Sequence, residues 1–212
     1  MTDTRDGLID QVSRYYAGKI AEHGETPRGV DWNDEAGQHA RFAEVCKVIE
    51  PDRDGFSLND LGCGYGALLD YLLSRHSGVR YHGFDVSSEM LDSARTRWQS
   101  QPDATFTAAS TPTRESDYGV ASGIFNVRLN RADDEWRAYM LDTLDALDAT
   151  SRRGFAFNCL TSYSDPDRQR DDLYYVNPGE VFDICKQRYA RNVALLHDYG
   201  LYEFTVIVRK TV

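Results

Sequence analysis

A glycine-rich loop at the end of a predicted strand constrains the fold of this chain more than any other feature. The loop runs from Asp60 to Gly66, between a strand predicted over 56–61 and a helix predicted over 67–75. The same alternation then repeats, with strands predicted over 79–85, 104–108, 118–125 and 154–160 and helices predicted over 87–98, 133–147 and 178–189. Alternating strands and helices of this kind form a parallel sheet joined by right-handed crossovers.

The two ends of the chain depart from this alternation. Strands predicted over 193–197 and 202–209 are separated by a short turn containing Gly200, which permits only an antiparallel pair. Before residue 51, apolar residues recur at helical spacing and predict two helices, the second over 33–50. We therefore predict a doubly wound, mostly parallel sheet over residues 51–212, with an antiparallel C-terminal strand and a helical N-terminal cap or lid over residues 1–50.

Composition excludes several classes of partner. The 212 residues carry a net charge of −10, which disfavours binding to nucleic acid. No stretch of about 18 apolar residues predicts a membrane span, and the first residues do not have the pattern of a secretory signal. The four cysteines show no C-x-x-C spacing, so we predict no zinc or other metal site. A cytoplasmic location is expected.

The position of the glycine loop predicts a ligand. Doubly wound sheets bind ligands at the carboxyl ends of their strands, and glycines allow backbone N–H groups to approach a ligand closely. Asp85 ends the next predicted strand, where its carboxylate can accept two hydrogen bonds from ribose hydroxyls. The loop therefore predicts a nucleotide-containing cofactor.

Two cofactor motifs fit the loop. The spacing of Gly62, Gly64 and Ala67 matches the dinucleotide pattern G-x-G-x-x-G/A. The segment from Asp60 to Gly66 also matches D-x-G-x-G-x-G. Three features favour the second motif: the carboxylate of Asp60, Cys63 after the first glycine, and the antiparallel terminal hairpin. A carboxylate at Asp60 would repel the negative charge of a pyrophosphate.

Three segments together carry a resemblance to a known family. They are Asp60-Leu61-Gly62-Cys63-Gly64-Tyr65-Gly66, Gly83-Phe84-Asp85-Val86-Ser87-Ser88-Glu89-Met90-Leu91 and Ala121-Ser122-Gly123-Ile124-Phe125-Asn126. From about residue 56 onward the chain resembles the class I S-adenosylmethionine-dependent methyltransferases. The resemblance implies a Rossmann-like, seven-stranded sheet whose last strand is antiparallel, and S-adenosylmethionine as cofactor. The helical cap resembles that of the small-molecule methyltransferases.

The resemblance also implies cofactor-binding residues in the loops that follow the strands. They are Asp60, Gly62, Cys63, Gly64, Gly66, Asp85, Val86, Met90, Ala109, Ser110 and Gly123. Asp60 would hold the amino group, Asp85 the ribose hydroxyls, and Gly123 would lie beside the sulfonium. Many relatives carry an acid after the third strand, where this chain has Ala109 and Ser110, so Ser110 or a backbone carbonyl must replace it.

The predicted cap supplies three further candidates. Gln38 and Arg41 are three residues apart and share a helix face. The cofactor carboxylate needs a cation, and a guanidinium matches its geometry. We therefore predict that Arg41, with Gln38 beside it, holds this carboxylate while the helix over 33–50 closes as a lid; a solvated helix is the alternative. Tyr16 is a third candidate, because a hydroxyl near the sulfonium is common in this family.

These observations predict a methyltransferase that transfers a methyl group from S-adenosylmethionine to a small-molecule acceptor. Its five histidines are scattered, and no catalytic residue is predicted. Alignment of the reacting groups supplies much of the acceleration in such a transfer. A nicotinamide-dependent dehydrogenase and a non-catalytic S-adenosylmethionine-binding regulatory protein are the alternatives. The acceptor atom and the oligomeric state stay open.

Overall fold

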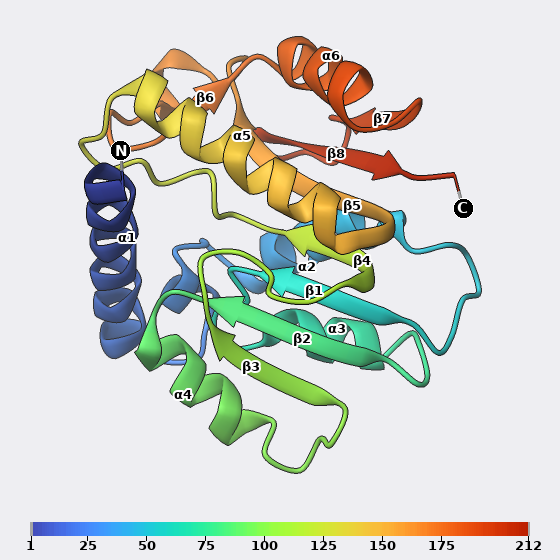
Figure 1. Ribbon diagram of the computed structural model, residues 1–212. Coiled ribbons are helices and arrows are strands. Elements are labelled where there is room, and N and C mark those ends of the chain that lie inside the picture. Colours follow the sequence, from blue (N-terminus) through green and yellow to red (C-terminus); the bar gives the residue numbers. More distant parts are fainter. Residues whose placement is uncertain (1, 212) are drawn as a thin grey trace.

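One sheet forms the centre of the computed structural model, which describes residues 2–211 (Figure 1). Its strands are β1 (Ser57–Leu61), β2 (Arg80–Asp85), β3 (Ala104–Ala108), β4 (Ser116–Ala121), β5 (Ser151–Thr161), β6 (Tyr175–Val176), β7 (Asn192–Leu196) and β8 (Glu203–Arg209). The main path runs in the order β3-β2-β1-β4-β5-β8-β7, and the two-residue β6 pairs with β5. Only β8 runs antiparallel to its neighbours β5 and β7 among the described strands. The predicted fold class is confirmed.

Two strands differ from the prediction. The segment 161–177, for which no strand or helix was predicted, contains β6, which is too short for a period-2 pattern to reveal it. Strand β4 ends at Ala121, although the apolar run continues to Phe125. Gly123 has a φ of 86°, which turns the chain out of the sheet at this point.

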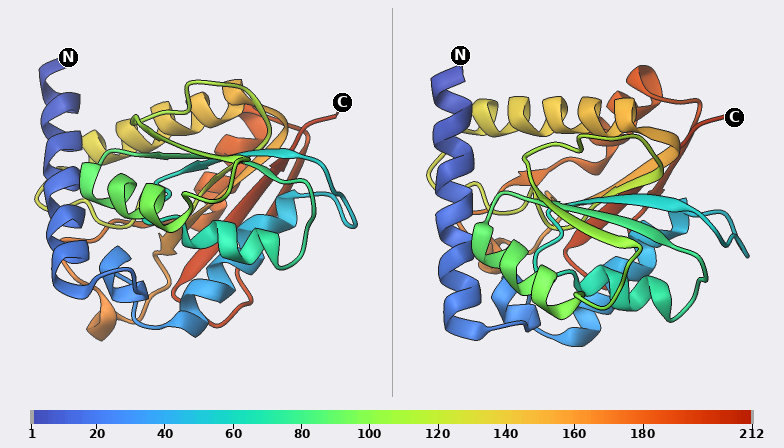
Figure 2. Two further views of the ribbon diagram at one scale, coloured as in Figure 1. Left: turned by 90° about the horizontal axis from the view of Figure 1, so that it is seen from below. Right: turned by 60° about the horizontal axis from the view of Figure 1, so that its bottom comes forward.

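Helices cover both faces of the sheet (Figure 2). They are α1 (Thr2–His23), α2 (Glu35–Val45), α3 (Ala67–Leu73), α4 (Ser88–Arg97), α5 (Asp133–Thr150) and α6 (Pro178–Arg188). On one face, Trp136 and Leu144 of α5 share a buried cluster with Phe155 and Phe157 of β5. On the other, α2, α3 and α4 bury their apolar sides in a second cluster that contains Tyr81.

Helix α1 stands along the edge where the parallel strands end (Figure 2). It is tied to the loop after β2 by a hydrogen bond of 3.1 Å from Ser13 Oγ to the carbonyl oxygen of Val86. Helix α2 has a different position, because Phe42 and Val45 are buried in the same cluster as residues of α3. Helix α2 therefore packs in the same core as the sheet. The cap or lid over residues 1–50 stays a prediction.

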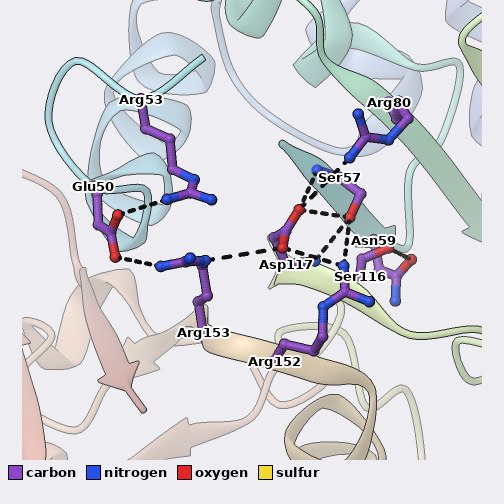
Figure 3. A network of polar contacts seen from close by, with 9 residues as sticks. All are labelled: Glu50, Arg53, Ser57, Asn59, Arg80, Ser116, Asp117, Arg152 and Arg153. Carbon is purple, nitrogen blue, oxygen red and sulfur yellow. Dashed lines mark hydrogen bonds and ion pairs between the residues drawn. The ribbon is translucent and has the colours of Figure 1, made fainter. Parts of the chain in front are cut away.

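At the opposite edge, a polar network joins the amino ends of four strands (Figure 3). Asp117 at the start of β4 accepts hydrogen bonds from the backbone N–H and the hydroxyl of Ser57, at 2.8 and 2.9 Å. Arg152 of β5 lies 3.2 Å from the same carboxylate, and Arg80 of β2 lies 3.9 Å from it. Burial acts to raise the pKa of Asp117, but the hydrogen bonds from Ser57 and Arg152 outweigh it and lower that pKa. This network fastens the edge that faces away from the candidate site.

Candidate functional site

A cavity of about 860 Å³, measured to include its mouth, opens at the carboxyl ends of β1, β2 and β4. Its walls come from the loops after these strands and from α1, α2 and α5. All the cofactor-binding residues predicted from the sequence line it, except Gly66 and Arg41. The sheet topology thus brings together side chains that are far apart in the sequence, as expected for strands that all end at one edge.

Asp85 is held at the end of β2 by backbone donors. Its Oδ2 accepts a hydrogen bond of 2.8 Å from the N–H of Gly64, and its Oδ1 accepts one of 2.9 Å from the N–H of Ser87. Burial raises the pKa of this carboxyl, against the lowering effect of these hydrogen bonds. A carboxylate offers about four acceptor sites. Asp85 therefore keeps acceptor capacity for hydroxyl groups of a ligand.

Asp60, at the end of β1, is a second buried carboxyl group in the cavity wall. It is 3% exposed, and the hydroxyl of Tyr81 donates a short hydrogen bond to its Oδ2. Burial raises the pKa of Asp60 to about 7; the hydrogen bond from Tyr81 lowers this pKa, and the charge of Asp85 adds to the rise. A nearby cation would favour the ionised form and reverse the shift.

The charge of the cavity indicates what kind of ligand fits. Asp60 and Asp85 line it, and none of the described lining residues is Lys, Arg or His. A ligand with positive groups, such as an ammonium and a sulfonium, would offset both carboxylates. Ser122 also lines the cavity, and its buried Oγ has no hydrogen-bond partner among the residues that the structure describes. A polar, cationic ligand therefore fits these residues.

Gly66, one of the predicted cofactor-binding residues, is not among the residues that line the cavity. It has a φ of 80° and precedes α3 as its N-cap. A Cβ atom at this position would lie 2.7 Å from Nε1 of Trp98, which donates a hydrogen bond of 3.1 Å to the carbonyl oxygen of Gly66. Packing and backbone conformation therefore both favour glycine here, and the role of Gly66 in cofactor binding stays a prediction.

Arg41 is also placed differently from the prediction. Its guanidinium is bound to the carboxylate of Glu203, with Nε 2.9 and 3.0 Å from the two oxygens. Gln38 alone of the predicted pair reaches the cavity, where its Nε2 lies 3.3 Å from the hydroxyl of Tyr65. The helix face was predicted from local spacing, which gives no sign of Glu203 far along the chain. A guanidinium already satisfied by Glu203 does not support the predicted contact with a cofactor carboxylate.

Sequence reasoning missed several apolar residues of the cavity wall. Val12, Val30 and Tyr139 line it together with the predicted Tyr16. Their helical spacing resembles that of core residues, so no sequence signal separates a wall residue from a core residue. Burial raises the pKa of Tyr16 well above its ordinary value, so its hydroxyl is neutral. The wall is therefore apolar and aromatic opposite the two carboxyl groups.

Two other features are absent from the described part of the chain. Among the side chains that the structure describes, there is no group of three or more His, Cys, Asp or Glu residues that could hold a metal ion. In the same part of the chain, no helix combines the length and the hydropathy needed to cross a bilayer.

Comparisons with known proteins identify the family. Residues 59–128 match the family described as "Methyltransferase domain". The chain is 61% identical over 157 residues to "Putative methyltransferase Rv1506c" of Mycobacterium tuberculosis, which covers 74% of this chain and 95% of that protein.

Solved structures share the fold. Magnesium protoporphyrin IX methyltransferase (ChlM) from Synechocystis PCC 6803, with bound SAM, has a TM-score of 0.67 and 14% identity over 95% of this chain and 97% of that one. The DhpI–SAH complex has a TM-score of 0.61 and 16% identity over 96% of this chain and 97% of that one. Both structures were solved with S-adenosylmethionine or its product bound.

Proposed function

The chain belongs to the class I S-adenosylmethionine-dependent methyltransferases, and from this premise we propose that it methylates a small-molecule acceptor. The observation that carries the proposal is the cavity itself. Its walls are largely apolar, and α1 stands along the edge at which it opens, which suits a small molecule better than a polymer. The net charge of −10 supports the same choice, because it disfavours nucleic acid. ChlM, by its name, also acts on a small molecule.

We propose the following contacts with S-adenosylmethionine. Asp85 accepts hydrogen bonds from the ribose hydroxyls, because its carboxylate keeps acceptor capacity beside the bonds from Gly64 and Ser87. Asp60 faces the amino group, whose positive charge favours the ionised carboxylate. The adenine-side contacts rest on four residues that line the same cavity: Val86, Met90, Ala109 and Ser110.

The residues of the cavity then act mainly by positioning. S-adenosylmethionine, when bound, supplies a methyl group on a positively charged sulfur. The apolar side chains of Trp32, Ile124 and Tyr139 exclude water, while Asp60 and Asp85 orient the ligand through its polar groups. Holding two reactants in one orientation removes much of the entropic barrier to their reaction. We assign no general base, so the acceptor is proposed to enter as a competent nucleophile.

We further propose that the protein works in the cytoplasm. All four cysteines, Cys46, Cys63, Cys159 and Cys185, are free and buried. Free buried thiols are typical of proteins from a reducing compartment, whereas secreted domains more often pair theirs.

The proposed acceptor class is tested with S-adenosylmethionine that carries a radioactive methyl group. The purified protein is incubated with it and with a cell extract separated into small metabolites, protein and RNA. Transfer of label into the metabolite fraction supports the proposal. Transfer only into protein or RNA contradicts the acceptor class while leaving the methyltransferase family intact.

A further inference from the structure

Arg41 and Glu203 form a partly buried ion pair next to the cavity wall. The side chain of Glu203 is 2% exposed and that of Arg41 is 14% exposed, and Arg41 contacts Glu203 through Nε and Nη2. Taking two charges out of water is costly, and replacing such a pair by apolar residues is often neutral or stabilising. Stability alone therefore does not explain this ion pair. Its role must lie in the residues that the two side chains hold in place.

The antiparallel strand is what brings Glu203 to this edge. Glu203 is the first residue of β8 and pairs with Leu160, near the end of β5. Because β8 runs against the parallel strands, its first residue lies where they end. The strand that is peculiar to this fold thus delivers a carboxylate to the edge that carries the cavity.

Asn158 connects Glu203 to the cavity wall. It is fully buried, its Nδ2 donates a hydrogen bond of 2.8 Å to Oε2 of Glu203, and its Oδ1 accepts one of 2.7 Å from the N–H of Gly123. The carboxylate can only accept from Asn158, so Glu203 determines which way the amide faces. Gly123 lines the cavity in the loop after β4, and this amide holds its backbone.

Trp32 is held by the same pair from the other side. The guanidinium carbon of Arg41 lies 4.9 Å from the centre of the indole ring. The ring also packs against Gly123, because a Cβ atom there would be 3.1 Å from Cζ2 of Trp32. Both Trp32 and Gly123 line the cavity. One ion pair thus supports two adjoining parts of a single wall.

We propose that Arg41 and Glu203 are a positioning pair for methyl transfer. The pair fixes Gly123 through Asn158 and fixes Trp32 by stacking, and so sets the wall against which the cofactor is aligned. This inference rests on the binding of S-adenosylmethionine and is independent of the acceptor class. Neither residue touches the ligand in this account.

Two variants test the ion pair, each by removing a different property of one side chain. Glu203→Gln keeps the shape of the side chain but removes the charge, and Arg41→Lys keeps the charge but loses the planar fork and the stacking on Trp32. Each is expected to raise the dissociation constant of S-adenosylhomocysteine about tenfold, by calorimetry on samples that circular dichroism shows to be folded. Asp117→Asn is the matched control at the opposite edge (Figure 3); it should lower the melting temperature and leave this constant unchanged.

A spectroscopic readout separates positioning from simple loss of stability. Glu203→Gln should change the near-ultraviolet circular dichroism of the folded protein by loosening Trp32, and the change should disappear in a Trp32→Phe background. Asp117→Asn should give no such change, because it lies at the other end of the strands.

Tighter ligand binding by Glu203→Gln would indicate a different role for Arg41. If Arg41 held the cofactor carboxylate directly, Glu203→Gln would free the guanidinium of Arg41 and so tighten the binding of the ligand. Unchanged or tighter binding by the variants overturns the proposal, and so does an equal weakening by Asp117→Asn. Where Glu203→Gln does not fold, Arg41→Lys decides by the same criteria. Failure of the wild-type protein to bind S-adenosylhomocysteine would instead refute the cofactor site.

Discussion

Lowering the pH from 8 to 6 should weaken the binding of S-adenosylhomocysteine about tenfold, because Asp60 must be ionised to face the ligand's ammonium group. Burial raises the pKa of Asp60 to about 7 in the ligand-free protein. With that pKa, roughly nine tenths of the carboxyl groups are ionised at pH 8 and roughly one tenth at pH 6. Binding at pH 6 must then release close to one proton for each ligand bound.

The raised pKa of Asp60 also determines how the free energy of unfolding depends on pH. The folded-state pKa of Asp60 lies above its ordinary value of 3.8, so the folded protein holds this proton more tightly than the unfolded chain. The contribution of Asp60 to the free energy of unfolding is therefore largest below about pH 4 and falls as the pH rises to about 7. Ligand binding removes this loss, so the rise in melting temperature caused by the ligand should grow between pH 6 and 8.

Calorimetry at pH 6, 7 and 8, in buffers with different ionisation enthalpies, measures both the affinity and the released proton. Asp60→Asn should abolish the slope of affinity with pH. Asp85→Asn is the control, because Asp85 is the other carboxyl group in the cavity wall and its pKa is also raised by burial. If the slope survives in Asp60→Asn and is lost in Asp85→Asn, the reasoning about Asp60 is refuted.

Three further outcomes are expected. Asp85→Ala should raise the dissociation constant of S-adenosylhomocysteine roughly ten- to hundredfold, because hydrogen bonds to a charged group contribute about 1.5–3 kcal/mol. An unchanged affinity by calorimetry would show that Asp85 does not bind the ligand. Asp117→Asn should lower the free energy of unfolding at pH 7 by about 1–3 kcal/mol in urea titrations. Folding lowers the pKa of Asp117 below its ordinary value of 3.8, so its stabilisation of the protein is present above pH 3.8 and is lost as the pH falls further. The difference in free energy of unfolding between wild type and Asp117→Asn should therefore shrink in acid. Gly66→Ala should lower the melting temperature, because the added Cβ atom would meet Trp98. At temperatures where the variant is folded, its affinity for the ligand should be unchanged. A change in affinity with no change in melting temperature would show that Gly66 contacts the ligand.

Most of the fold could be predicted from local patterns, because every strand except β6 and every helix carries its own signal. The alternation after residue 56 and the short turn at Gly200 determine the parallel sheet and its antiparallel end, and the structure confirms both. The two-residue β6 carries no such signal, since its pairing with β5 depends on tertiary contacts. Strand β4 was predicted too long because an apolar run does not show where Gly123 turns the backbone.

The candidate site was predictable where a motif combines with strand ends, and unpredictable where a partner lies far away in the sequence. Asp60 and Asp85 lie at the carboxyl ends of two parallel strands, so they meet at one edge whatever the side chains around them. Arg41 has a helix position that suits a cofactor carboxylate, yet Glu203 takes its guanidinium through a strand that begins 162 positions later. Only the packed structure shows that contact, and it changes the inferred role of Arg41 from ligand contact to support of the wall.

A calorimetric titration of the wild-type protein, with S-adenosylhomocysteine in one experiment and NAD in another, shows which cofactor the cavity binds. We expect one site with micromolar or tighter affinity for S-adenosylhomocysteine and no binding of NAD. Ligand at a hundredfold excess over its dissociation constant should then stabilise the fold by about 2.7 kcal/mol. Binding of NAD without binding of S-adenosylhomocysteine would contradict the account of Asp60, Asp85 and the cavity between them.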